Sequence, residues 1–118
     1  MIKFSVEDPV SINSLIGLRG NRKFETKEYV SFKENVKLIV DGLNIEKPIV
    51  GDLYCNVVFY TKNKTRRDLD NYAFKGLFDA IVEAGLIVDD SFFYRLNAVK
   101  SKVNPRKCNW LEVEIGII

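Results

Sequence analysis

Two short acidic motifs contain the side chains best suited to chemistry in this 118-residue chain. Asp68 and Asp70 lie in the run RRDLDN at residues 66–71, and Asp90 follows twenty residues after Asp70, directly after Asp89. If Asp68 to Asp70 form the end of a strand, both side chains point to the same side, because side-chain direction repeats every two residues. Three carboxylates within about 5 Å would repel by roughly 3 kcal/mol per pair at an effective dielectric of about 20. Such a cluster needs protons or a cation, and oxygen ligands alone favour Mg²⁺ or Mn²⁺.

The same residues also fit a simpler structural role. Asp70 or Asn71 is a good N-cap for a following helix, and Asp68 is placed to pair with Arg66. Short motifs of this kind match by chance easily. The combination of a basic run, the DLDN motif, an amphipathic helix, a glycine and a second acidic pair nevertheless favours a metal site over a cap.

The complete absence of histidine narrows the chemistry further. It excludes Ser-His-Asp and Cys-His nucleophilic catalysis, histidine acid–base catalysis and the zinc sites that contain histidine. The two cysteines, Cys55 and Cys108, form no metal-binding pattern and lie in apolar alternating stretches. We therefore expect free thiols that pack as small hydrophobic groups. Catalysis then has to depend on carboxylates, lysine, tyrosine or a bound hard cation.

Basic residues gather in three segments, although the net charge of the chain is only +2. Residues 19–33 carry a net charge of +3, residues 61–67 of +4 and residues 95–107 of +5. Solvated loops would explain this distribution, but three positive segments in so short a chain favour a polyanionic partner. Beside a hard-cation site they indicate phosphoryl transfer on a nucleic acid. Residues 95–107 are expected to follow a phosphate backbone, and the candidate DNA-binding residues are Arg19, Arg22, Lys23, Lys27, Lys62, Lys64, Arg66 and Arg67.

Two amphipathic helices are expected to pack on a sheet. The first begins at residue 28 with Thr26 as its N-cap and ends near Gly42, and the second spans residues 71–84 and ends at Gly85 in a left-handed conformation. The 3.6-residue spacing of their apolar residues favours core packing over base stacking. These residues are Tyr29, Phe32, Val36, Ile39, Val40 and Leu43 in the first helix and Phe74, Leu77, Phe78 and Ile81 in the second.

Alternating apolar and aromatic residues predict four strands around these helices. The order β-α-β-α-β-β predicts one α/β (α+β) domain over residues 1–118, with a mixed or antiparallel sheet and the helices mainly on one face. Phe92, Phe93 and Tyr94 are adjacent and cannot all face one side of a strand. The expected strands are 1–6, 49–60, 92–103 and 107–117, with 7–27 as a loop and a turn at 104–105.

Several motifs occur together in a characteristic order. RRDLDN is followed by Lys75 and Asp79 in the next helix and then by GLIVDDS at residues 85–91. In this combination the sequence resembles the RusA-like Holliday junction resolvases. Upstream, SINSL at 11–15 and GNRKFETKEY at 20–29 resemble the N-terminal substrate-contacting loop of that family, so the resemblance covers most of the chain. It implies a small bacterial or prophage homodimer with two active sites, which cuts two symmetric strands of a four-way DNA junction with Mg²⁺.

The resemblance also suggests a role for individual residues. Asp68 and Asp70 correspond to the paired aspartates of the family, Asp90 corresponds to its third metal-binding aspartate, and Asp89 assists or only flanks it. Lys75 corresponds to the helix lysine, but it lies five residues after Asp70 instead of the family's four, which rotates a helical side chain by about 100°. Our hypothesis is that the three aspartates hold Mg²⁺, or Mn²⁺ in its place, and that Lys75 or an arginine of the basic run stabilises charge on the phosphate.

Two alternatives stay open at this level. A non-catalytic nucleic-acid-binding accessory module explains the charge distribution equally well and predicts no dependence on a divalent metal. A Mg²⁺ nuclease acting on flaps or replication forks has the same residues, because junction choice depends on dimer geometry. No apolar run approaches the ~18 residues that a membrane span requires, so we expect a cytoplasmic protein, encoded by a bacterium or its prophage, with no membrane partner.

Overall fold

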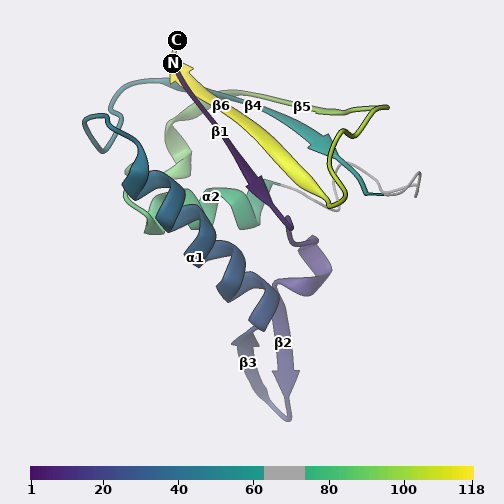
Figure 1. Cartoon of the computed structure of the whole chain (residues 1–118). Coiled ribbons are helices and arrows are strands. Elements are labelled where there is room, and N and C mark those ends of the chain that lie inside the picture. The colour runs from purple at the N-terminus through teal and green to yellow at the C-terminus, as the bar shows by residue number, and fades with distance from the viewer. Residues whose placement is uncertain (63–73) are drawn as a thin grey trace.

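The computed structural model describes residues 1–62 and 74–118, which form a four-stranded sheet, a separate two-stranded hairpin and two α-helices. Figure 1 shows α1 and α2 on the same side of the main sheet and the hairpin projecting from one end of α1. The elements are β1 (Ile2–Glu7), η1 (Ile12–Ser14), β2 (Ile16–Arg19), β3 (Arg22–Glu25), α1 (Lys27–Gly42), β4 (Leu53–Tyr60), α2 (Phe74–Glu83), η3 (Asp90–Phe92), β5 (Phe93–Lys100) and β6 (Trp110–Ile117).

The main sheet has the strand order β1-β6-β4-β5 and is mixed. β6 is antiparallel to both β1 and β4, whereas β4 and β5 are parallel, with Leu53 opposite Phe93 and Phe59 opposite Lys100. Parallel neighbours need a crossover connection, and α2 lies in the one between β4 and β5. Because β4 lies between β6 and β5, it is an interior strand of the sheet.

The core lies between the main sheet and the two helices. Leu53, Cys55, Val57 and Phe59 alternate inward along β4. Burial raises the pKa of the Cys55 thiol to about 12, so this side chain packs as an apolar group. Both cysteines are free, as predicted. The helices cover the strand with Phe32, Val36 and Val40 from α1 and Leu77, Phe78, Ala80 and Ile81 from α2.

Most predicted elements are confirmed with shifted ends. Thr26 caps α1, its hydroxyl oxygen accepting a hydrogen bond from the backbone N–H of Tyr29 at 3.2 Å. Gly85 follows α2 with φ +83°, the left-handed conformation expected there. Phe93 packs inward on Phe78, with ring centroids 4.6 Å apart, while its neighbours Phe92 and Tyr94 are exposed. The predicted start of the second helix at 71–73 lies outside the described residues. Among the residues the structure describes, no helix has the length and apolarity to span a membrane.

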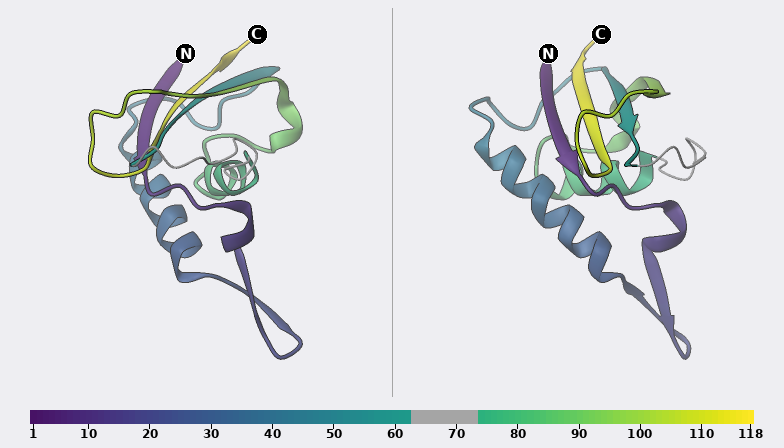
Figure 2. Two further views of the ribbon diagram at one scale, coloured as in Figure 1. Left: turned by 90° about the vertical axis from the view of Figure 1, so that its right-hand side faces the viewer. Right: turned by 45° about the vertical axis from the view of Figure 1, so that its right-hand side comes forward.

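The prediction of a loop over residues 7–27 is wrong, because this segment contains η1 and the β2–β3 hairpin. Arg19 pairs with Arg22 across a two-residue turn, in which Gly20 has φ +58°. A glycine in the first central position is the feature that type II′ hairpin turns require. Figure 2 shows from two further directions that the hairpin projects beyond the rest of the fold. Its strands lack an apolar face against the core, so the alternation that reveals a strand is missing.

Candidate active site

The predicted metal ligands Asp68 and Asp70 lie outside the described residues, as do the basic residues Lys64, Arg66 and Arg67. The structure does show where the chain leaves β4 before this motif and where it enters α2 after it. These two ends, together with the Asp89–Asp90 pair and Lys75, are the parts of the candidate site that can be described.

Side chains of the 101–109 loop hold the end of β4. Asn109 Oδ1 accepts a hydrogen bond from the backbone N–H of Lys62 (2.6 Å), and Asn104 Nδ2 donates to the carbonyl of Thr61 (2.8 Å). Trp110 fixes Asn104 in turn, because its Nε1 donates to Asn104 Oδ1 at 2.8 Å. The chain therefore leaves the sheet from a fixed position, and the exposed Lys62 is the last described residue before the DLDN motif.

The two acids of the Asp89–Asp90 pair have different environments. Asp89 is the N-cap of η3, and its carboxylate accepts hydrogen bonds from the backbone N–H of Asp90 (2.9 Å) and from Ser91 Oγ (2.7 Å). The bond from Ser91 is the main cause of the lowered pKa of Asp89. Asp90 is exposed at the first position of η3. Asp89 thus has a local structural role, and Asp90 is the better placed of the two to meet a ligand.

The described residues provide one member of the predicted metal-binding set. Asp90 precedes β5, whose first residue lies opposite the first residue of β4, whereas the chain reaches Asp68 and Asp70 from the last residue of β4. Within residues 1–62 and 74–118, no three Asp, Glu or Cys side chains gather closely enough to hold a metal ion.

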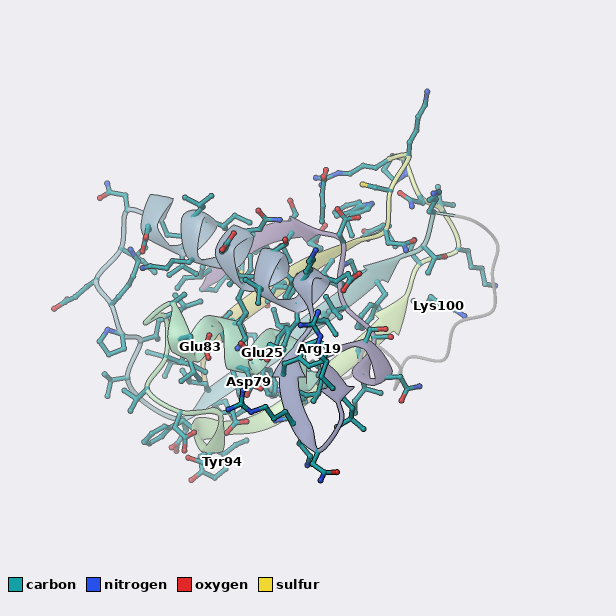
Figure 3. All side chains as sticks on the ribbon, turned by 90° about the horizontal axis from the view of Figure 1, so that it is seen from below. Arg19, Glu25, Asp79, Glu83, Tyr94 and Lys100 are labelled. Carbon is teal, nitrogen blue, oxygen red and sulfur yellow. The ribbon has the colours of Figure 1, made fainter. Side chains whose placement is uncertain are left out.

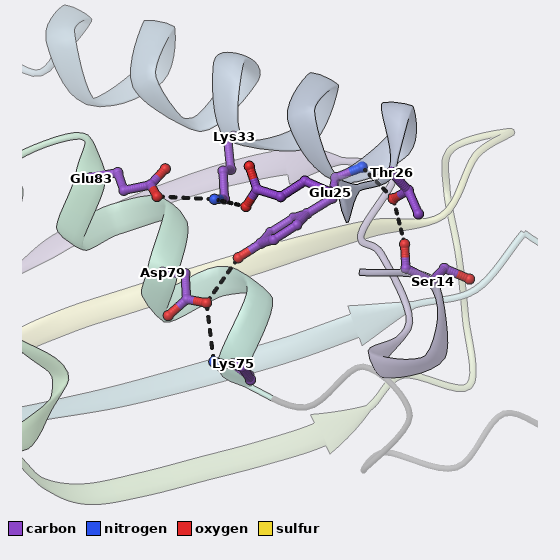
Figure 4. Close-up of polar contacts among 8 residues, drawn as sticks. Ser14, Glu25, Thr26, Lys33, Lys75, Asp79 and Glu83 are labelled. Atoms are coloured by element: carbon purple, nitrogen blue, oxygen red, sulfur yellow. Dashed lines mark hydrogen bonds and ion pairs between the residues drawn. The ribbon is translucent and has the colours of Figure 1, made fainter. Parts of the chain in front are cut away.

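Lys75 lies in the first turn of α2 and joins a bridge to α1, shown in Figure 4. Asp79 Oδ2 accepts a hydrogen bond from the Tyr29 hydroxyl at 2.9 Å and lies 3.3 Å from Lys75 Nζ. Burial, and then the hydrogen bond to Asp79, raise the pKa of Tyr29, so the hydroxyl keeps its proton as a donor. We call Tyr29, Asp79 and Lys75 the first bridge.

A second bridge joins the same helices one turn further along and consists of Glu25, Lys33 and Glu83. Lys33 Nζ lies 3.0 Å from Glu83 Oε1 and also pairs with Glu25. Burial acts to lower the pKa of Lys33, but the hydrogen bonds to Glu25 and Glu83 outweigh it and raise the pKa. Within the described residues no ion pair joins the second bridge to Lys75, although the Lys33 ammonium lies over the Tyr29 ring, 4.2 Å from its centroid.

The hairpin carries the predicted DNA-binding residues Arg19, Arg22 and Lys23 on exposed positions. Phe24 covers Gly17 on the neighbouring strand, where any side chain would clash with its ring. The Arg19 guanidinium lies over the same ring, 5.6 Å from its centroid. The hairpin therefore presents a basic tip supported by one aromatic side chain.

Part of the basic segment 95–107 makes surface contacts with other residues of the protein. The Arg106 guanidinium stacks on Trp110 at 3.9 Å from the ring centroid and lies 3.7 Å from a carboxylate oxygen of Glu7. Arg95 lies over the ring of Tyr54 at 5.1 Å. These contacts reduce the charge that the segment can offer to a partner. Figure 3 shows that Lys100, in this segment, and Arg19, on the hairpin, lie on separate parts of the molecule.

Comparison with known proteins identifies the family of the chain, which the geometry of the described residues alone does not. Residues 9–116, nearly the whole chain, match the family described as Endodeoxyribonuclease RusA. The chain belongs to the RusA family. A curated relative, the crossover junction endodeoxyribonuclease RusA of Enterobacteria phage HK97, is 26% identical over 103 residues, which cover 87% of this chain and 85% of that protein. The predicted family and enzyme class are confirmed: this RusA-family protein is a hydrolase that acts on DNA.

Two polar residues of this RusA-family chain were not predicted as part of the site. The sequence could have identified Asp79 as a partner of Lys75, because it follows Lys75 by four residues, the spacing of neighbours on a helix face. No sequence pattern indicated a role for the Tyr29 hydroxyl. Periodicity predicts that its ring is buried, which is correct at 2% exposure, but it does not identify the partner of the hydroxyl fifty residues away.

Proposed function

We propose that this protein resolves four-way DNA junctions by paired symmetric incisions that depend on Mg²⁺, and that residues 1–118 act as one endonuclease domain within a homodimer. The observation that carries the proposal is the match to the RusA family over residues 9–116, which includes both acidic motifs. The crossover junction activity of the phage HK97 relative supports a branched substrate. Two copies are needed because two symmetric strands have to be cut.

Asp68, Asp70 and Asp90 are the residues that would hold the metal. Their chemistry fits a hard cation, because all three are carboxylates and the chain contains no histidine. The exposed position of Asp90, beside an Asp89 that is occupied by capping, also fits this role. When bound, Mg²⁺ would orient the scissile phosphate and lower the pKa of an attacking water. Lys75 would stabilise negative charge that develops on the phosphate, as would Arg66 or Arg67.

The basic residues would bind the phosphate backbone without reading sequence. On the hairpin these are Arg19, Arg22 and Lys23, and Lys27 follows at the start of α1. Lys62, Lys64, Arg66 and Arg67 would contact DNA beside the acidic motif. Phosphate contacts of this kind position a protein on DNA and make its affinity depend strongly on salt.

The direct test is cleavage of labelled junction, duplex and flap DNA with Mg²⁺, with Mn²⁺ and with chelator. We expect symmetric cuts in the junction only when metal is present. Asp68→Asn, Asp70→Asn and Asp90→Asn should each abolish cutting, while Asp70→Asn keeps or strengthens junction binding because a negative charge near phosphate is removed. Asp41→Asn is the matched control, since this exposed acid pairs with Lys37 at 3.2 Å on the surface of α1.

The other outcomes separate the alternatives. Binding without metal-dependent cutting, unchanged in Asp68→Asn, would show an accessory module with DLDN as a helix cap. Preferential cutting of flaps would show a fork or flap nuclease. Loss of both binding and cutting in Asp70→Asn, together with a lower thermal midpoint, would assign that residue to the fold.

A further inference from the structure

Lys75 has an exposed side chain, and its ion-pair partner Asp79 is bound to α1 by a part-buried hydrogen bond. The Lys75 side chain is 65% exposed and that of Asp79 is 38% exposed. An exposed ion pair four residues apart on a helix contributes little to stability, and a lysine that precedes its acid is the less favourable order. Something other than this pair must therefore fix the position of Asp79.

The fixed point is the Tyr29 hydroxyl. Tyr29 is 2% exposed, so its ring has one position in the interface between α1 and α2, and its hydroxyl donates to Asp79 Oδ2 at 2.9 Å. The same oxygen is the one that lies 3.3 Å from Lys75 Nζ. A single carboxylate oxygen therefore contacts both a buried tyrosine and an exposed lysine, and Figure 4 draws both contacts at Asp79.

The ammonium keeps donors for a substrate in this arrangement. A lysine ammonium has three N–H donors, and Asp79 takes one of them. The remaining two are exposed at the N-terminal turn of α2, where the chain arrives from the segment that contains Asp68 and Asp70. Lys75 lies one position later than the family's spacing, and Asp79 determines the direction of its side chain.

We propose that Asp79 and Tyr29 are positioning residues, which hold the Lys75 ammonium for the cleaved phosphate while touching neither DNA nor metal. The inference rests on the proposed function, because it needs Lys75 to act in DNA cleavage. It also links the N-terminal turn of α1, directly after the hairpin, to the helix that carries Lys75. Asp79 thereby acquires a role in cleavage that goes beyond joining two helices.

The second bridge supplies a matched control. Lys33 and Glu83 join the same two helices at 3.0 Å, four residues along each helix from Tyr29 and Asp79. Glu83→Gln therefore removes a comparable α1–α2 ion pair and changes none of the hydrogen-bonding groups of the first bridge, and Glu25 stays in place to hold the Lys33 ammonium near the Tyr29 ring. A purely structural role of Asp79 predicts equal effects of Asp79→Asn and Glu83→Gln on cleavage.

The experiment measures junction cleavage in single-turnover conditions, with protein in excess and Mg²⁺ present, and junction affinity separately in chelator. Lys75→Met should lower the rate at saturating protein by about 100-fold, the size expected for a lost electrostatic donor. Asp79→Asn should lower it about tenfold, and Tyr29→Phe, which keeps the packed ring, about threefold. Affinity should change less than about twofold in all three, since only transition-state interactions are removed. Glu83→Gln should cut like the wild type.

A double variant decides whether Asp79 acts through Lys75. Asp79→Asn should cause no further loss in a Lys75→Met background, because the residue it positions is gone. The inference would be overturned if Asp79→Asn lowered the cleavage rate by the same factor in the wild type and in Lys75→Met. It would also be overturned if neither Asp79→Asn nor Tyr29→Phe lowered the rate. If Lys75→Met cuts at full rate while Asp70→Asn does not cut, the proposed nuclease stands and only the positioning role falls. If the wild type cuts no substrate, both fall.

Discussion

The main sheet with its helices and the β2–β3 hairpin differ in how their side chains are divided between the interior and the surface. In β4 every second residue is buried against α1 and α2, whereas no residue of β2 or β3 is buried. In the main sheet and its helices several charges are held in ion pairs, such as that of Lys33 with Glu83, whereas Arg19, Arg22 and Lys23 of the hairpin are exposed. The buried core and the residues that we propose for DNA contact on the hairpin therefore lie in different parts of the molecule.

The two regions are nevertheless rigidly joined. Leu15, directly before the hairpin, is 4% exposed, and its carbonyl accepts a hydrogen bond from the Thr26 N–H at 3.1 Å. The Thr26 hydroxyl also donates to the carbonyl of Ser14 while it caps α1. The base of the hairpin is thus part of the fold even though its strands are not. A partner that binds the tip meets a hairpin whose base is fixed against α1.

The largest expected difference between the two regions concerns stability. Ile81 in α2 is 0% exposed, so Ile81→Ala should lower the free energy of unfolding by about 2–5 kcal/mol through lost packing and a cavity. Ile16 in β2 is 48% exposed, and Ile16→Ala should change it by less than about 0.5 kcal/mol. Urea denaturation of both variants measures this. Equal losses would show that the hairpin is part of the cooperative core.

The reverse difference is expected for DNA binding. Replacing Arg19, Arg22 and Lys23 together by alanine should weaken junction binding and reduce the slope of log affinity against log salt by up to about three, one per lost phosphate contact. The thermal midpoint should not change, because these side chains are exposed. Lys37→Ala is the control, since Lys37 is paired with Asp41 at 3.2 Å. An unchanged salt slope in the triple variant would mean that the hairpin does not contact DNA.

The smallest expected effect is a loss of folding stability at alkaline pH. It comes from the main sheet with its helices and not from the hairpin. The pKa of Tyr29 is raised by burial and by the bond to Asp79, so its contribution to stability is complete below its ordinary value of 10.0 and is lost as the pH rises through the folded-state pKa. The unfolding free energy of the wild type should therefore fall more steeply above about pH 10 than that of Tyr29→Phe. Because Tyr29 contributes to the raised pKa of Lys33, the comparison measures the Tyr29 hydroxyl together with its effect on Lys33. The hairpin triple variant should follow the wild-type curve.

Sequence was informative wherever one face of an element is buried. The spacing of Phe32, Val36 and Val40 predicts α1, and the β-branched and aromatic residues of 49–60 predict β4. The hairpin was missed because both of its faces are exposed, although Gly20-Asn21 is a recognisable turn signal. The parallel pairing of β4 with β5 was also beyond reach, because strand order depends on long-range packing.

For the candidate site, residue types were predictable and partners were not. The motif identifies Asp90, Asp89 and Lys75 as a group, but only the structure shows that Asp89 accepts a hydrogen bond from Ser91. Likewise, the bond between Tyr29 and Asp79 joins residues fifty positions apart, and no local pattern encodes it. The metal-binding roles of Asp68 and Asp70 stay predictions, since both lie outside the described residues.

The two-residue turn at Gly20 and Asn21 restricts how relatives of this protein can lengthen the hairpin. One residue inserted into each strand would advance the turn by about 3.4 Å, but it would move Arg19 and Arg22 to the opposite face, away from the Phe24 ring. Two residues per strand restore the face and extend the reach by about 7 Å, roughly two nucleotide steps along a duplex. Insertions in pairs are therefore the ones that preserve the arginine pair beside the Phe24 ring while changing how far the tip of the hairpin lies from α1.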